Sequence, residues 1–210
     1  MNERIEPSPW STIWLRPKET IRRIVDTNPR YQVIFLAILG GIGQTLANAR
    51  GMGDMFSFGA LIFLCLLAGP MGGLLSLYIS GFVMHWTSAR LGGTATREQV
   101  RAVIAWSWAP IVYTLPLWGV KYILFREELF TTGKTFIESQ PALSFLFELF
   151  TAVDFVITIW YLMILFIGLA EVNRISVGRG IAAAVLAFVL VGIPALLLVY
   201  FLAPQGMLGQ

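Results

Sequence analysis

Five long apolar stretches constrain this chain more than any other feature of its 210 residues. A helix needs about 20 apolar residues to cross the roughly 30 Å hydrocarbon core of a bilayer. Inside that core every backbone amide must be hydrogen-bonded within the protein, and the stretches do not alternate in the manner of barrel strands. We therefore predict an all-α integral membrane protein. Its five transmembrane helices are expected over residues 31–49, 58–86, 102–124, 143–169 and 181–202.

The composition supports this organisation. Hydrophobic residues make up 57% of the chain and charged residues only 13%, whereas a soluble domain carries about 25% charged residues. This excludes a disordered tail, a coiled coil and an ordinary soluble enzyme. We expect a cytoplasmic N-terminal segment (1–30) without a cleavable signal peptide, because it is polar, then a transmembrane domain (31–203) and a tail (204–210).

The distribution of positive charge predicts the topology. The stretch 58–86 contains Gly69-Pro70, so it is either one kinked, tilted helix or a hairpin of two half-helices. With five crossings, eleven Lys and Arg residues lie on one side and four on the other; with a hairpin the distribution is nine against six. The positive-inside rule favours five crossings in the cell (inner) membrane, with the N-terminus cytoplasmic and the C-terminus outside.

The N-terminal segment has the pattern of a short amphipathic helix. Pro17 suits the first turn of a helix, and Ile21, Ile24 and Val25 share one face. We predict an interfacial helix that contacts lipid through two tryptophans and four basic residues. These residues are Trp10, Trp14, Arg16, Lys18, Arg22 and Arg23. The alternative is a plain cytoplasmic cap packed on the bundle.

Small residues mark two helix faces. Small side chains let membrane helices approach closely, so these faces predict either packing within the chain or an oligomer interface. The residues are Gly40 and Gly43 in the first stretch and Gly69, Gly73, Ser76 and Ser80 in the second.

Acidic residues inside the fourth stretch are the main functional candidates. Asp154 lies on one polar stripe with Thr151, Thr158 and Tyr161, and Glu148 lies nearer the outer end. An ionised carboxylate at that depth is costly, so Asp154 should face the bundle. We expect no Lys or Arg at matching depth; the expected partners are tyrosine hydroxyls, water and the amides of Gln44 and Asn48. An ion or proton site, a lipid-headgroup contact and a structural carboxyl all fit this pattern.

Catalytic motifs are not found. Gly133-Lys134-Thr135 lacks the earlier glycine of a phosphate-binding loop, and the single histidine and single cysteine exclude sites that need two of either residue. No nucleophile–base pair is found. We therefore expect no enzymatic activity, catalytic residue, cofactor or metal, and a charge of +3 gives no reason to expect a nucleic-acid partner.

Several short motifs together carry a family resemblance. They are the segment from Trp14 to Ile24 (WLRPKETIRRI), Asn28-Pro29, Gly69-Pro70-Met71-Gly72-Gly73, Leu91-Gly92-Gly93-Thr94 and Trp106-Ser107-Trp108-Ala109-Pro110. With them, residues 10–203 resemble a prokaryotic member of the Yip-one domain family of Ypt-interacting, multispanning membrane proteins.

The resemblance implies five spans and a non-enzymatic role. Eukaryotic relatives are Golgi and endoplasmic-reticulum proteins linked to vesicle traffic and small GTPases. Their long cytoplasmic N-terminal region has only about thirty counterpart residues here, and no catalytic residues carry over. The expected function is membrane organisation or a trafficking-like process through contacts with lipids, a membrane-protein partner or a second copy. The alternative is a small-solute or ion transporter or channel that uses the intramembrane carboxylate.

Overall fold

A computed structural model describes residues 8–202, with only the backbone described at residue 195 and over 198–202. Every regular element in this range is helical. The predicted tail (204–210) and the start of the predicted N-terminal segment lie outside the described residues. The elements are α1 (Pro9–Thr12), α2 (Pro17–Thr27), α3 (Val33–Ala47), η1 (Met52–Asp54), α4 (Phe58–Arg90), α5 (Arg97–Ser107), α6 (Ala109–Phe125), η2 (Arg126–Leu129), α7 (Thr135–Glu138), α8 (Pro141–Asn173) and α9 (Val177–Leu202).

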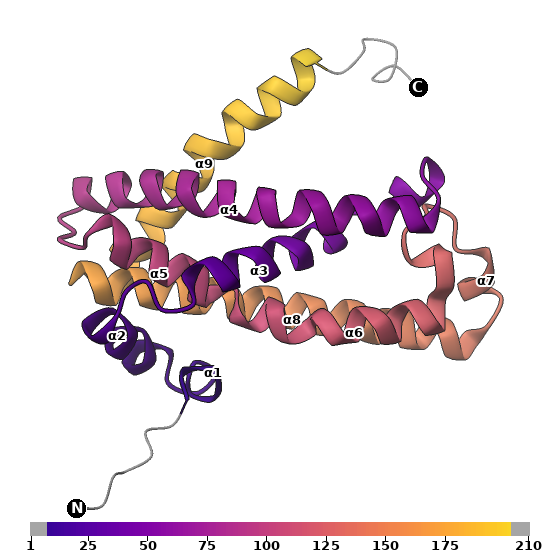
Figure 1. Cartoon of the computed structure of the whole chain (residues 1–210), viewed down its shortest axis with the longest axis horizontal. Coiled ribbons are helices and arrows are strands. Elements are labelled where there is room, and N and C mark those ends of the chain that lie inside the picture. Colours follow the sequence, from indigo (N-terminus) through magenta and orange to yellow (C-terminus); the bar gives the residue numbers. More distant parts are fainter. Residues whose placement is uncertain (1–7, 203–210) are drawn as a thin grey trace, which may run out of the picture.

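The long helices form two layers that are joined tightly at one end only. Helices α3 and α4 form one layer, α6 and α8 form the other, and α5 packs between them at the end that also carries α2 (Figure 1). The largest buried cluster lies at this α5 end and includes Leu36, Trp106 and Leu165. At the opposite end a smaller cluster around Phe130 links the layers, and another around Phe125 joins α6, α7 and α8 within one layer. Helix α9 packs on α4 and α8 and then projects away from the bundle.

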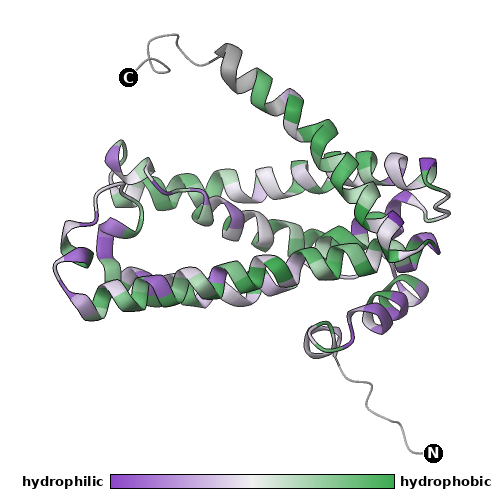
Figure 2. Ribbon diagram, turned by 180° about the vertical axis from the view of Figure 1, so that it is seen from behind, coloured by the Kyte–Doolittle hydropathy of each residue, from purple (hydrophilic) through white to green (hydrophobic). Residues whose placement is uncertain are grey.

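Among the described residues 8–202, four helical segments are long and apolar enough to cross a membrane. They are α4, the segment Arg97–Leu129, α8 and Val177–Pro194 of α9. Apolar residues run along them, while hydrophilic residues gather at the ends of the bundle (Figure 2). The first predicted span corresponds to α3, whose 15 residues rise only about 22 Å. The chain is thus a multi-pass, all-helical membrane protein.

Helix α4 passes through Gly69-Pro70 without a break, as one helix of 33 residues and about 50 Å. It packs closely on α3. A Cβ atom added at Gly41 would overlap the backbone of Gly69 and Gly73, so the two backbones are nearly in contact. The predicted face of α3 is therefore a different one from the face that meets α4. Gly40 lies against Trp108 and Gly43 against Ile111.

The predicted third span is two helices. It begins at Arg97, five residues before the predicted start, because Thr96 and Gln99 form a capping box: the Gln99 N–H donates to Thr96 Oγ1 (3.3 Å) and the Thr96 N–H to Gln99 Oε1 (2.9 Å). The helix is interrupted at Trp108, just before Pro110, whose ring nitrogen cannot donate a hydrogen bond.

Helix α2 packs on the bundle. Its apolar residues Ile21, Ile24 and Val25 are buried, and the helix contacts α5 and α8. The apolar face of α2 is therefore covered by protein, as expected for a helix packed on the bundle, and the predicted lipid contact falls to the other residues of the segment.

Candidate functional site

The candidate site is a cavity between α3, α6 and α8, in the half of the bundle where the two layers separate. Its volume is about 480 Å³. Its wall combines apolar side chains with charged and amide groups, so it suits an amphipathic occupant or water. The lining residues include Leu46, Ile111, Trp118, Phe150 and Ile157 on the apolar side and Gln44, Asn48, Arg50, Lys121, Thr151, Asp154, Thr158 and Tyr161 on the polar side.

An ion pair between Lys121 and Asp154 crosses the cavity wall. Lys121 Nζ lies 2.8 Å from Asp154 Oδ1 and 2.6 Å from Oδ2. The Lys121 side chain is 4% exposed, whereas that of Asp154 is 48% exposed. The ammonium also lies 4.7 Å from the centre of the Trp118 ring, a cation–π distance. The carboxylate is therefore compensated by a buried cation and remains accessible from the cavity.

This pair corrects the prediction that Asp154 has no basic partner. Lys121 lies only four residues before the end of α6, whereas Asp154 lies 13 residues after the start of α8. The two meet because η2, α7 and the first turns of α8 extend beyond the end of α6. A signal was present in the sequence, since Lys121 falls inside the apolar stretch 102–124.

Six of the seven predicted intramembrane polar residues line this one cavity. They are Asp154, Thr151, Thr158, Tyr161, Gln44 and Asn48; Glu148 is exposed and does not line it. The hydroxyls of Thr151 and Thr158 donate to the carbonyls of Phe147 (2.9 Å) and Asp154 (2.8 Å), and the Asn48 amide donates to the Gln44 carbonyl (2.8 Å). These groups are satisfied by their own helices and do not hold the Asp154 carboxylate.

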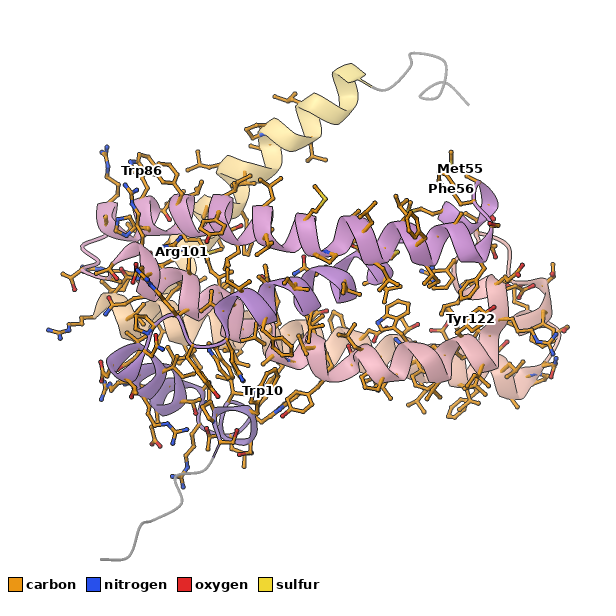
Figure 3. All side chains as sticks on the ribbon, in the orientation of Figure 1. Trp10, Met55, Phe56, Trp86, Arg101 and Tyr122 are labelled. Carbon is orange, nitrogen blue, oxygen red and sulfur yellow. The ribbon has the colours of Figure 1, made fainter. Side chains whose placement is uncertain are left out.

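The predicted lipid-contact residues of the N-terminal segment lie at the other end. Trp10 donates to Gln32 Oε1 (2.7 Å) and its ring meets that of Trp106 edge-on at 5.4 Å, while Trp14 meets the Tyr113 ring. In Figure 3, Trp10 lies against the bundle, whereas Met55, Phe56 and Tyr122 lie at the end that holds the cavity.

The basic residues of α2 and of its N-cap, Arg16, are mostly engaged with protein. Lys18 and Arg22 pair with Glu171 of α8, Arg16 lies 3.7 Å from Glu19, and Arg23 donates to Thr12 Oγ1 at 3.3 Å. Lys18, Arg22 and Arg16 remain largely exposed, so contact of this basic face with a lipid surface stays a prediction.

The small residues predicted on α4 also include Ser76 and Ser80, and both of these side chains are half-buried.

Comparison with known proteins identifies the family. A search of curated proteins and a search of solved structures found no significant match. The family model for the Yip1 domain, in contrast, matches residues 10–199. The match includes the segments from Trp14 to Ile24 and from Trp106 to Pro110 and the whole of the cavity. The chain therefore belongs to the Yip1 domain family of membrane proteins.

Proposed function

We propose that this protein is a non-enzymatic, five-span protein of the cell (inner) membrane that contributes to membrane organisation by holding a membrane lipid between α3, α6 and α8. The observation that carries the proposal is the cavity itself. The pocket of about 480 Å³ has both aromatic and charged walls, and two of its three helices belong to segments of membrane-crossing length. Membrane lipids are the amphipathic molecules that such a site would meet. Apolar surface in the wall favours an acyl chain, and the polar groups favour a headgroup or ester.

The fifth crossing is proposed from the chain that follows α3. Residues 48–57, which follow α3, contain no helix except η1. The N–H groups of Gly51 and Gly53 donate to the Phe130 carbonyl at 2.7 and 3.0 Å. This segment therefore reaches the end of the bundle where η2 lies. Non-helical backbone is tolerated at membrane depth where it lines a cavity, and Asn48 and Arg50 do so.

The topology is testable by labelling. In a background with Cys65 replaced by alanine, single cysteines at Ser11 and at the C-terminal Gln210 should react with an impermeant thiol reagent from opposite sides of the membrane. Ser11 should be reached from the cytoplasm only. Labelling of both positions from one side would exclude five crossings.

Occupancy of the cavity is testable by photolabelling. We expect Thr151→Phe, which narrows the cavity, to reduce crosslinking of a photoreactive phosphatidylcholine in nanodiscs. The matched control is Val153→Phe on the exposed side of the same turn, because Val153 does not line the cavity. Equal crosslinking of the two variants and the parent would contradict lipid binding in this cavity.

A second candidate function is ion or solute transport, and the half-exposed Asp154 carboxylate on the cavity favours it. This function predicts a proton or cation flux in proteoliposomes that is lost in Asp154→Asn, measured per folded protein. A flux that persists in this variant would remove Asp154 from a transport path.

A further inference from the structure

Two cations face one aromatic ring at the outer end of the cavity. Lys134 Nζ lies 3.6 Å and Arg50 Cζ 5.5 Å from the centre of the Phe147 ring. Phe147 is buried, and both Phe147 and Arg50 line the cavity. Each cation comes from a different loop, Arg50 from the segment after α3 and Lys134 from the segment before α7.

The protein brings these loops together by specific hydrogen bonds. The carboxylate of Asp54 accepts from the N–H (3.1 Å) and the hydroxyl (2.7 Å) of Thr132. Gly51, at a φ of +82° that favours glycine, donates to the Phe130 carbonyl. These bonds hold the loop that carries Arg50 against the loop that leads to Lys134.

The charge of this pair is not neutralised by a contacting acid. Over residues 8–202, Arg50 and Lys134 have no carboxylate within ion-pair distance. Burial first, and the nearby Arg50 charge second, lower the pKa of Lys134, although Glu148 and Glu138 act to raise it. Glu128 accepts from the N–H groups of Phe136 and Ile137 instead. Deeper in the cavity, Lys121 is already compensated by Asp154.

We propose that Arg50 and Lys134 form the recognition site for the phosphate of an anionic phospholipid, whose apolar part occupies the cavity. This inference rests on the lipid binding proposed above and adds its headgroup class. Arginine and lysine are the usual partners of phosphate oxygens, and unpaired basic residues near a membrane surface attract anionic lipid. A zwitterionic headgroup satisfies the pair less well, because it carries its own cation.

The test compares two photoreactive lipids, phosphatidylglycerol and phosphatidylcholine, each incorporated at the same trace level in phosphatidylcholine nanodiscs that hold the full chain. The measured quantity is the ratio of the two crosslinking yields. The parent should favour phosphatidylglycerol, and Arg50→Gln or Lys134→Gln should each lower the ratio about fivefold. Lys134→Arg should retain it. Arg126→Gln is the matched control: Arg126 lies over an aromatic ring at this end, 5.3 Å from the centre of Phe136, but that ring does not line the cavity, whereas Phe147 does.

The outcomes separate the headgroup site from cavity occupancy. A ratio near one in the parent, or an equal ratio in the parent and in whichever Gln variant folds, would overturn the headgroup site while leaving lipid occupancy intact. Thr151→Phe should reduce both yields together, and its failure to do so would refute occupancy. Excess inorganic phosphate should leave the ratio unchanged; if it abolishes the preference, the site binds free phosphate and the lipid assignment is wrong.

Discussion

The ion pair between Lys121 and Asp154 should respond asymmetrically to loss of either partner. The two side chains differ strongly in exposure, 4% for the lysine and 48% for the aspartate. We consider Asp154→Asn, Lys121→Met and the double variant. In the first, a buried ammonium loses its carboxylate; in the second, a carboxylate that the cavity already reaches loses its cation; in the third, both charges are gone.

The magnitudes follow from this difference. Breaking a buried ion pair by removing one partner costs about 3–5 kcal/mol because an uncompensated charge remains buried. For Asp154→Asn we expect the lower end, about 3 kcal/mol of unfolding free energy, since water in the cavity partly replaces the carboxylate. For Lys121→Met we expect about 1 kcal/mol, as for an exposed charge that loses a partner. The double variant should lie within about 1 kcal/mol of the parent.

The assay is reversible unfolding in mixed micelles at increasing dodecyl sulfate fraction, followed by the fluorescence of the seven tryptophans. The four proteins form a double-mutant cycle, and the expected coupling energy is about 4 kcal/mol. The argument from unequal exposure would be refuted if the two single variants lost equal amounts of unfolding free energy. It would also be refuted if the loss of unfolding free energy in the double variant were the sum of the two single losses. A loss in Lys121→Met larger than that in Asp154→Asn would reverse it.

Three further predictions concern other contacts. Gly41→Ala should lower the unfolding free energy by about 1–3 kcal/mol, because its methyl group meets the backbone of α4, while Gly72→Ala, with no atom within 4 Å, should be neutral in the same assay. Glu171→Gln removes the acceptor of two α2 cations and should speed limited proteolysis between α2 and α3; Glu19→Gln should not. Because the pKa of Lys134 is lowered, its charge is present at low pH and is lost as the pH rises through that lowered pKa. The preference for anionic lipid should therefore be lost at a lower pH than the one at which an ordinary lysine titrates. A preference that persists up to that ordinary pH would contradict the burial argument.

The sequence predicts the helical class and most of the long helices because hydropathy over 20 residues is a strong signal. The predicted ends of the helices are less accurate, because the ends depend on local capping and on proline. Thr96 begins α5 through its capping box, and Pro141 begins α8 two residues before the apolar stretch. A proline inside an apolar stretch does not by itself tell whether the helix breaks there. Pro70 lies inside the continuous helix α4, whereas α5 ends shortly before Pro110.

The candidate site was predictable in its residues but not in its pairing. Asp154 and its polar stripe on α8 follow from helical spacing alone. The partnership with Lys121 does not, because it depends on how far the end of α8 extends beyond that of α6. Helix rotation is equally hidden in a single sequence. Gly40, Gly41 and Gly43 all suit close packing, and the structure places Gly41 on α4 and the other two on side chains from Trp108 to Leu115.

The shortness of α3 explains why a cavity exists at all. Helices α4 and α8 have 33 residues each, whereas α3 ends at Ala47 after 15, so beyond that point only α4 remains in the layer that faces α6 and α8. Stacked rings bridge the two layers beyond the end of α3: Phe58 lies 3.9 Å from Tyr122, centre to centre. The space that α3 leaves is lined by its last turn, the segment after it and the ion pair on the opposite wall. Extending α3 by two turns in a designed variant would fill this space, so lipid crosslinking should fall even though Lys121 and Asp154 are retained.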